Sequence, residues 1–409
     1  MNSQTIFKNF AAVAFPFLLL ACAELPRVFA QAGGTATKPT SGVGANGAGP
    51  ALFAPGADVT EIPASFIGNQ VFLPVRVNRS APSLFRLDSS ESSTSISPAR
   101  LAELAAPVFS TTVLNLPGSD LPMKALPAIE KKDFAAQVGR TYEGTLGNDF
   151  LNCYVAEIDY SRQTVRLYDP GPYQYTGKSK KITLTFVGAL PVVRAKVLLP
   201  KGKTFEADFV LNTALDAGVV ISNRYASAHH LPSLKTISAN DPQLSANGGT
   251  VSSRLKEFQI GDYTVEGSIA DFSSAPMPFG DNDKLAGEIG GGMLRRFTVI
   301  FDYPHQQLIL TPNLHLGEDD HEDMSGISMI ALGPGLKTFQ VTQVAPGSAA
   351  AHEQIQAGDV IVGIDQDPAA DLTLEEFLDA FRQVGHKYKL VISHNGQTRE
   401  VTIEMRRRL

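Results

Sequence analysis

The feature that most constrains the fold is a turn pattern that occurs twice in the chain. In the first copy, an apolar strand ends at Asp88, and a Ser-rich turn leads to a hydrophobic return at residues 96–97. In the second copy, the apolar residues 209–211 end at Asn212, and a turn of small residues leads to a return at 221–222. The same order of strand, polar residue, turn and return indicates an internal duplication, which predicts two similar β-rich halves.

The repeat continues beyond these turns. Residues 144–151 carry a hydrophobic-Gly element and are followed by a strand, and residues 287–294 repeat this arrangement. Each copy then enters a second strand that ends at a proline, Pro170 in the first copy and Pro312 in the second. The agreement between several parts in the same order favours one duplicated body over two unrelated domains.

The turns and hydrophobic-Gly elements resemble the Asp-Thr/Ser-Gly and Ile-Ile-Gly motifs of retropepsin-like aspartic proteases, over residues 61–313. This resemblance implies a mostly β, two-lobed acid-protease β-barrel fold in which each lobe brings one turn to a pseudo-twofold axis. The first lobe is then expected at residues 59–172 and the second at 180–314. The resemblance also places a flap hairpin within residues 110–135.

The chain departs from the family pattern at the residues that carry the chemistry. The first motif is Asp88-Ser89-Ser90, and the second is Asn212-Thr213-Ala214. Aspartic proteases use two carboxylates that share one proton. An amide at position 212 can donate a hydrogen bond but cannot hold that proton. General acid–base assistance contributes roughly 10²–10⁴-fold per positioned group, so most of the rate should be absent.

We therefore predict a degenerate catalytic centre and hypothesise a pseudoenzyme. Its residues are Asp88, Ser89, Asn212 and Thr213. The alternative is an active aspartic endopeptidase that uses Asp88, and a simple Asx-turn at Asp88 is a third interpretation. The side chains of Ser90 and Ala214, where the family has glycine, are expected to separate the two turns. Another acid lying against Asp88 would contradict the hypothesis.

The C-terminal segment carries a different set of motifs. Residues 339–344 alternate as a strand, a Pro-Gly-Ser-Ala-Ala turn follows at 346–350, and Ala-Gly-Asp-Val-Ile-Val-Gly-Ile follows at 357–364. Residues 374–384 have apolar positions at i, i+3, i+4 and i+7, which predicts an amphipathic helix. These motifs, in this order and spacing, resemble a PDZ domain of the bacterial type over residues 326–409.

The PDZ resemblance implies that an extended peptide adds as a strand to an exposed sheet edge. It places the groove between the strand at 339–344 and the helix at 374–384, with a carboxylate-binding loop at 333–338. The predicted peptide-binding residues are Gly335, Leu336, Lys337, Thr338, Phe339, Gln340 and Val341. The loop lacks the Gly-Leu-Gly-Phe form, so it leaves open whether the ligand ends in a free C-terminus. Lys337 either assists a carboxylate or is an exposed loop lysine.

The N-terminus has the pattern of an export signal. Lys8 precedes an apolar run at 10–23, and Val28-Phe29-Ala30 forms a small-residue cleavage site, which predicts a signal peptide at 1–30. In the alternative, residues 19–22 resemble a bacterial lipobox, and a lipid anchor at Cys22 provides the contact with a membrane. Both predict an exported protein, periplasmic or extracellular. The other cysteine, Cys153, is expected to be a buried, unpaired thiol.

Two segments are predicted as linkers. Residues 31–58 are rich in Gly, Ala, Thr and Pro without periodicity and predict a flexible linker. The acidic run at 315–325 predicts a solvated linker between the duplicated body and the C-terminal domain. The net charge of −6 provides no general basic field, so nucleic acid is not an expected partner. No cofactor or metal site is predicted. We expect an exported protein that binds peptides or protein segments, with C-termini among the candidates.

Overall fold

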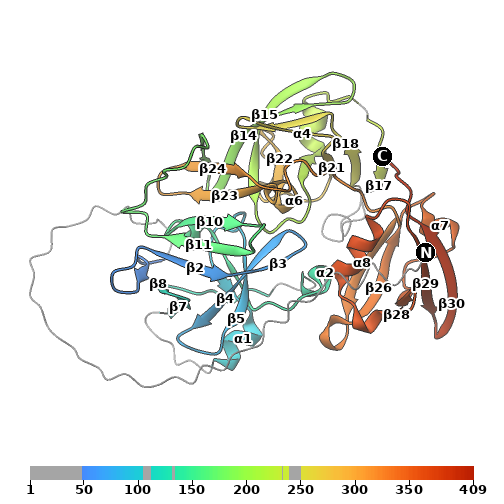
Figure 1. Cartoon of the computed structure of the whole chain (residues 1–409), viewed down its shortest axis with the longest axis horizontal. Helices are drawn as coiled ribbons and strands as arrows, with labels where there is room; N and C mark the ends of the chain where they lie inside the picture. The colour runs from blue at the N-terminus through green and yellow to red at the C-terminus, as the bar shows by residue number, and fades with distance from the viewer. Residues whose placement is uncertain (1–47, 105–111, 131–133, 233, 239–249) are drawn as a thin grey trace, which may run out of the picture. The chain divides into compact units, whose positions relative to one another are not determined.

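The computed structural model describes residues 48–104, 112–130, 134–232, 234–238 and 250–409. Their strands form four sheets, and short helices connect them (Figure 1). The predicted signal peptide, Cys22 and most of the 31–58 linker lie outside the described residues. The described end of that linker is ordered, because β1 (Leu52–Phe53) pairs with β8 (Ser119–Met123). The predicted mostly β architecture is confirmed.

The first repeat forms one sheet. Its strands in spatial order are β1, β8, β7 (Thr112–Leu116), β4 (Gln70–Val77), β5 (Ser83–Leu87), β9 (Gly144–Leu146) and β6 (Ser95–Ile96), with β3 (Ser65–Ile67) beside β4. Strand β5 leads into the Asp88 turn and runs parallel to β9, which also pairs antiparallel with the return strand β6. β7 and β8 form a hairpin with its turn at Pro117-Gly118, within the residues 110–135 where the resemblance places a flap.

The second repeat forms an equivalent sheet. Its strands in spatial order are β17 (Ile237–Ser238), β18 (Val251–Arg254), β21 (Ile269–Ser273), β16 (Val219–Ser222), β22 (Leu285–Gly290), β15 (Thr204–Asn212), β14 (Leu190–Leu198), β19 (Glu257–Ile260) and β20 (Tyr263–Glu266), with β13 (Thr185–Val187) beside β14. Strand β15 leads into the Asn212 turn, runs parallel to β22, and β22 pairs antiparallel with the return strand β16. The pairing around the two turns is the same, as the sequence repeat predicts.

A third sheet joins the two repeats. Its strands in spatial order are β12 (Lys181–Thr183), β24 (Gln307–Pro312), β23 (Phe297–Asp302), β10 (Val155–Asp159), β11 (Thr164–Tyr168) and β2 (Val59–Pro63). The equivalent strands β10 and β23 pair antiparallel at its centre, with Val155 opposite Asp302 and Asp159 opposite Thr298 (Figure 1). The apolar side chains of both repeats belong to one continuous hydrophobic core. The repeats are therefore one folding body.

The glycine of each hydrophobic-Gly element allows the turn to close. A Cβ at Gly147 would lie 2.6 Å from the carbonyl carbon of Ser93, and a Cβ at Gly290 would collide with the carbonyl oxygen of Ala217. The turn backbone therefore packs directly on the end of β9 in the first repeat and of β22 in the second. A side chain at either glycine would push its turn away from the other repeat.

The helices are short. They are α1 (Pro98–Glu103), α2 (Phe134–Val138), α3 (Asn148–Leu151), α4 (Asn223–Ala228), α6 (Gly291–Leu294), α7 (Ala349–His352) and α8 (Leu374–Phe381). Helix α1 begins at Pro98 and is capped by Ser97 Oγ, as its sequence indicates. Within the described residues, no helix combines the length and apolar character needed to cross a membrane.

The C-terminal domain has its own sheet and its own core. Its strands in spatial order are β25 (Ile327–Leu332), β26 (Thr338–Val344), β27 (Val360–Ile364), β29 (Lys387–His394) and β30 (Gln397–Glu404), with β28 (Asp367–Pro368) beside β27. Short 3₁₀ turns at Pro334–Leu336 and Ala369–Asp371 complete it. Helix α8 buries Phe377 against Phe339, with ring centroids 4.8 Å apart. These side chains form a hydrophobic core separate from that of the body.

The acidic segment before this domain is not a solvated linker, and that prediction is wrong. Arg296 is fully buried and donates hydrogen bonds to the backbone carbonyls of His315, Leu316 and Glu318. Its guanidinium also lies 2.6 Å from the Asp320 carboxylate. Arg254 pairs with Glu322 at 3.0 Å. Arginines that come from the body therefore hold the segment, and spacing within the segment itself could not reveal this.

Cys153 is a free thiol, as predicted, but it is only half-buried and lies in the turn after α3. Its thiol donates to the carbonyl of Asp149 at 3.2 Å, and burial raises the pKa of the thiol to about 12. The thiol is consequently protonated at neutral pH and a poor nucleophile.

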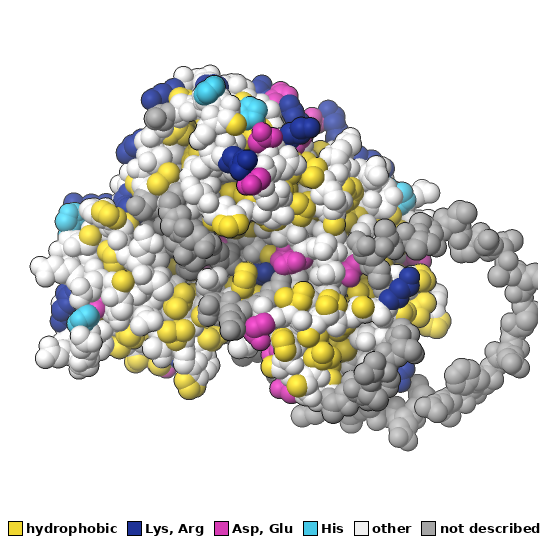
Figure 2. Space-filling view, turned by 180° about the vertical axis from the view of Figure 1, so that it is seen from behind, with side chains coloured by type: hydrophobic (Ala, Val, Ile, Leu, Met, Phe, Trp, Pro, Cys, Tyr) yellow, Lys and Arg dark blue, Asp and Glu magenta, His cyan; other side chains and the backbone are white. Residues whose placement is uncertain are grey.

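On the face drawn in Figure 2, Lys and Arg side chains lie in several small groups among acidic and apolar ones.

Candidate functional site

The first turn holds Asp88 through three hydrogen bonds. Asp88 Oδ1 accepts from the backbone nitrogen of Ser90 at 3.0 Å and from Ser90 Oγ at 2.6 Å. Asp88 Oδ2 lies 3.0 Å from Arg86, and both side chains of this ion pair are buried. The bond from Ser90 to a side chain two residues earlier is an Asx-turn, which was one of the interpretations of the sequence. The turn therefore supplies a carboxylate whose two oxygens already have donors.

The second turn has the same local geometry with an amide in place of the acid. Asn212 Oδ1 accepts from the backbone nitrogen of Ala214 at 3.0 Å, and Asn212 Nδ2 donates to Glu288 Oε1 at 2.7 Å. Glu288 comes from β22, which lies parallel to β15 with Gly290 opposite Asn212. The parallel pairing brings a glutamate from far along the chain to the second turn.

Glu288 is a second acid at this centre. Burial raises the pKa of its carboxyl to about 7; the Asn212 hydrogen bond lowers it, and the negative charge of Asp88 raises it further. Glu288 is therefore protonated over much of the acidic range. Glu288 is hydrogen-bonded to Asn212, and the negative charge that acts on its carboxyl is that of Asp88. The expectation that Asp88 is the only carboxylate at the paired turns is wrong.

The two turns are interlocked through their middle residues. Ser89 Oγ donates to the carbonyl of Leu211 at 2.6 Å, and Thr213 Oγ1 donates to the carbonyl of Leu87 at 2.8 Å. Each hydroxyl also accepts from the other residue's backbone nitrogen, both at 3.1 Å. The expectation that side chains replacing the family's glycines separate the turns is therefore wrong. Ser89 and Thr213 connect the repeats and are positioning residues.

Aromatic side chains cover the ion pair at the first turn. The Arg86 guanidinium lies 4.9 Å from the ring centroid of Phe134 and 5.3 Å from that of Tyr142. Burial raises the pKa of the Tyr142 phenol. Asp88 is 3% exposed, and Asn212 is 8% exposed. In this structure, the paired turns are almost closed to solvent.

Arg86 and Glu288 are the residues that sequence reasoning missed. Each is the charged residue inside an otherwise apolar strand, Arg86 in β5 and Glu288 in β22. A charge is seldom buried unless it is paired. Their positions could have indicated partners near the two turns, but the strand pairing that supplies those partners is visible only in the structure.

The structure does not support the groove predicted beside β26. Phe339 pairs with Ala331 of β25 and with Ile361 of β27, and Gln340 is likewise paired on both sides. Val341 pairs with β25 and exchanges backbone hydrogen bonds with residues 358–359. A strand with both edges occupied cannot accept a further strand. Assigning these three residues to strand addition is therefore wrong.

The predicted carboxylate-binding loop is a hairpin turn. Gly335 and Leu336 lie in the 3₁₀ turn that connects β25 with β26, and Thr338 opens β26 opposite Leu332. The Lys337 ammonium donates to the backbone carbonyl of Leu372 at 2.6 Å. Lys337 therefore stabilises the turn preceding α8. The predicted loop is present, and it connects two strands that pair with each other.

The edge strand of this sheet is β25. Among the described strands it pairs only with β26, so its other edge is not used by the sheet. Helix α2, from the first repeat, packs against β25. Gly139, directly after α2, lies against α8, where a Cβ on this glycine would meet the Leu374 side chain at 2.7 Å. The first repeat therefore contacts both β25 and α8.

A family model identifies the C-terminal domain. The model for the PDZ domain matches residues 314–393. Residues 314–393 are a PDZ domain. The matched range begins before the predicted start at residue 326 and ends before β30, whose strand completes the sheet. PDZ domains bind peptides or protein C-termini.

Other comparisons are more distant. The comparison with curated proteins finds no match. A photosystem II D1 C-terminal processing protease is 26% identical over 20% of this chain and 22% of its own, with a TM-score of 0.18. This match therefore spans about a fifth of that protease. A retropepsin-like aspartic protease from Rickettsia conorii is 15% identical over 34% of this chain and 95% of its own, with a TM-score of 0.24. Such TM-scores assign neither fold nor function.

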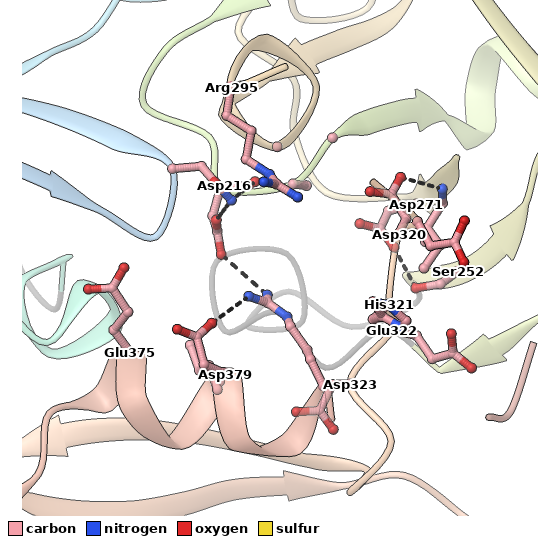
Figure 3. A pocket seen from close by; sticks show the side chains of 18 of the residues that line it. Asp216, Ser252, Asp271, Arg295, Asp320, His321, Glu322, Asp323, Glu375 and Asp379 are labelled. Carbon is pink, nitrogen blue, oxygen red and sulfur yellow. Dashed lines mark hydrogen bonds and ion pairs between the residues drawn. The ribbon is translucent and has the colours of Figure 1, made fainter. Parts of the chain in front are cut away.

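Charged contacts connect the PDZ domain with the body. Glu375 Oε1 accepts from the backbone nitrogen of Gly68 at 3.1 Å, and Arg382 lies 3.6 Å from Asp216 and 3.7 Å from Asp379. Figure 3 shows Glu375 and Asp379 projecting from α8 toward Asp216. Burial raises the pKa of Glu375 to about 7. A cavity of about 430 Å³ lies beside these residues, and most of its ionisable side chains are acidic.

Proposed function

We propose that this protein binds peptides or protein segments in a PDZ groove between β25 and α8. The observation that carries the proposal is the position of β25 at the edge of its sheet. An edge strand presents unpaired backbone donors and acceptors, to which an extended peptide can add. Helix α8 buries Leu374 and Phe377 in the core and presents Leu378 on its outer side, where Leu378 can contact a ligand.

Helix α2 must move for a strand to add to β25. It packs against this strand in the present structure, and its residues Gln137 and Val138 line a small cavity together with α8. The groove proposed here is therefore partly covered by the first repeat. Peptide binding would compete with the contact between α2 and β25.

Selection from a displayed random-peptide library against the full chain tests the groove. Leu378→Asp should abolish binding of the selected peptides, because it places a charge on the ligand side of α8. Val362→Asp is the matched control, because Val362 is an apolar residue of the same domain that is 38% exposed and lies on β27. Equal binding by both variants would place the ligand elsewhere.

We propose that the duplicated body is a degenerate aspartic-protease-like scaffold without hydrolytic activity. The second acid at this centre, Glu288, is hydrogen-bonded to Asn212, whereas the Asp88 carboxylate bonds to Ser90 and Arg86. These contacts of Asp88 support the proposal. Its carboxylate is paired with Arg86, accepts two bonds from Ser90 and is almost unexposed. A general base must be able to reach the water from which it takes a proton. Asp88 would have to give up existing bonds to do so.

One observation favours a second candidate, an aspartic-type endopeptidase. Glu288 supplies a carboxyl beside Asn212 whose pKa is about 7, so the centre holds two acids, Asp88 and Glu288, as a carboxylate pair requires. Peptidase assays of the wild type, Asp88→Asn and Glu288→Gln between acidic and neutral pH separate the two candidates. Cleavage that both substitutions abolish supports the enzyme; no cleavage by the wild type supports the scaffold.

We also propose that the protein is exported. The support is the sequence of residues 1–30, with Lys8, the apolar run and the small-residue site before residue 31. Mass spectrometry of the mature N-terminus distinguishes cleavage after Ala30 from lipid attachment at Cys22. Detection of an uncleaved Met1 in secreted or cellular protein would contradict both routes.

A further inference from the structure

The end of the ligand that meets the start of β25 is set by strand direction. A peptide that pairs antiparallel with β25 runs opposite to it, so its C-terminal end faces residues 323–326, where the chain enters β25. A free C-terminal carboxylate is captured by backbone N–H groups at such a position. Whether these N–H groups are already hydrogen-bonded therefore decides whether the groove can bind a free C-terminus.

Three backbone donors at this position already have acceptors inside the domain. The nitrogen of Met324 donates to the carbonyl of Phe381, the nitrogen of Gly326 donates to Asp323 Oδ1, and the nitrogen of Ile327 donates to Ser325 Oγ, each at 3.0 Å. The Asp323 carboxylate thus takes the place on Gly326 that a ligand carboxylate would need. A ligand would have to displace it to use this donor.

The backbone is held in this arrangement. Gly326 has φ = +78°, and a Cβ there would collide with the side chain of Ser348. The carbonyl of Gly326 accepts from the nitrogen of Ala345 at 2.8 Å. Ser325 Oγ donates to Asp323 Oδ1 at 2.7 Å, which fixes the carboxylate from a second side. The loop is therefore closed around Asp323 by contacts from two other segments.

The charges around this end of the groove also disfavour an anion. Glu322 and Asp323 line the neighbouring cavity together with Asp379 of α8 (Figure 3). Of the nearby arginines, Arg382 lies 3.6 Å from Asp216 and 3.7 Å from Asp379, and the charge of Arg408 interacts with those of Asp323 and Glu322. A terminal carboxylate would enter a site in which fixed acids outnumber the arginines.

We propose that this PDZ groove binds internal peptide segments, or chain ends without a negative charge, in preference to free C-termini, and that Asp323 sets this preference. The inference depends on the peptide-binding function proposed above for β25 and α8. A neutral or internal segment can bind through backbone hydrogen bonds to β25 alone. It does not need hydrogen bonds from the backbone nitrogens of Met324, Gly326 and Ile327. Asp323 acts through the loop and is a specificity-determining residue.

The test uses short random-sequence peptides, each synthesised as a free acid and as a C-terminal amide and immobilised through the N-terminus. The full chain and residues 314–409 are both applied, because the domain has its own core and α2 covers β25 in the full chain. We expect amides to bind at least as well as the matching free acids. Asp323→Ala should raise the ratio of free-acid to amide binding about tenfold. Without Asp323, the backbone nitrogen of Gly326 can donate a charge-assisted hydrogen bond to the terminal carboxylate of the peptide.

Asp365→Ala is the matched control, because Asp365 accepts from the backbone nitrogen of Lys389 in another turn of the same domain. It should leave the ratio unchanged, and thermal unfolding verifies that both variants are folded. Tenfold stronger binding of free acids by the wild type would overturn the inference while supporting peptide binding. An unchanged ratio in folded Asp323→Ala would also overturn it. Failure of every peptide to bind residues 314–409 would instead overturn the proposed function, and the inference with it.

Discussion

Ser89 and Thr213 hold the two repeats together by a reciprocal exchange of hydrogen bonds. The hydroxyl of each accepts from the backbone nitrogen of the other at 3.1 Å, and both residues are fully buried. The positions are equivalent within the sequence repeat, so the contact expresses its approximate twofold symmetry. These contacts position two turns, of which the first carries Asp88 and the second Asn212.

Thr213→Val should destabilise the body by about 2–4 kcal/mol. The substitution preserves shape but removes the acceptor for the nitrogen of Ser89 and the donor to the carbonyl of Leu87, and each buried unsatisfied group costs about 1–3 kcal/mol. Urea-induced unfolding measures the change. Thr311→Val, at an exposed hydroxyl that contacts Ser179, is the control. A loss no greater than that of the control would contradict this role.

Arg86→Met should cost about 3–5 kcal/mol, because it leaves the buried Asp88 carboxylate without its cation. Adding Asp88→Asn should restore more than half of this loss, since the amide still accepts from Ser90 and carries no charge. The coupling between the two substitutions is measured by a double-mutant cycle in urea unfolding. If the two changes in unfolding free energy were additive, Arg86 and Asp88 would have no coupling energy, which would contradict this prediction.

Glu288 should make the stability of the body depend on pH. Its pKa rises from 4.5 to about 7 on folding, so the folded state binds the extra proton in this interval. Its contribution to stability is therefore fully present below about pH 4.5 and is lost as the pH rises through 7, on the order of 3 kcal/mol. Unfolding free energies of wild type and Glu288→Gln between pH 4 and 8 measure this contribution. The exposed Glu266→Gln should retain the wild-type slope; a wild-type slope in Glu288→Gln would refute the assignment.

The contact between α8 and the body should weaken as pH rises. Burial raises the pKa of Glu375 from 4.5 to about 7, with Asp379 and Asp216 raising it and Gly68 and Arg382 lowering it. The contact between α8 and the body is therefore more stable at acidic pH, where Glu375 is protonated. This stabilisation is lost as the pH rises through 7. Hydrogen exchange of α2 and β25, corrected for intrinsic rates, should be slower at pH 5 than at pH 8.

Glu375→Gln should remove most of this pH difference, because the amide oxygen can still accept from Gly68 without titrating. Asp371→Asn, at an exposed position of the same domain, should retain it. An identical pH profile for wild type and Glu375→Gln would show that another group controls the contact.

Patterns within a few residues were enough to predict several elements. Helix α8 follows from the 3.6-residue periodicity of its apolar residues, and the hairpin of β7 and β8 lies within residues 110–135, where a flap is expected. The strand order around each repeated turn also agrees with the repeat. These features depend on local backbone preference, which a single sequence expresses directly.

The predictions that the structure contradicts concern contacts between residues far apart in the sequence. Arg296 binds the acidic segment, Glu288 reaches Asn212, and β25 rather than β26 is the edge strand. In each case the partner of a residue depends on the register of strands in a sheet or on packing between segments. The residues adjacent to it in the sequence show no periodic pattern from which this partner could be predicted.

The amino-acid order alone was enough to place a duplicated β body before a PDZ domain and to show that the second turn carries an amide where the first carries an acid. The ion pair between Arg86 and Asp88, and the second acid Glu288 beside Asn212, became visible only in the folded chain. This is because the energy and the protonation state of a charged side chain depend on its burial and on its neighbours. Those neighbours are supplied by parallel strand pairing between residues far apart in the chain.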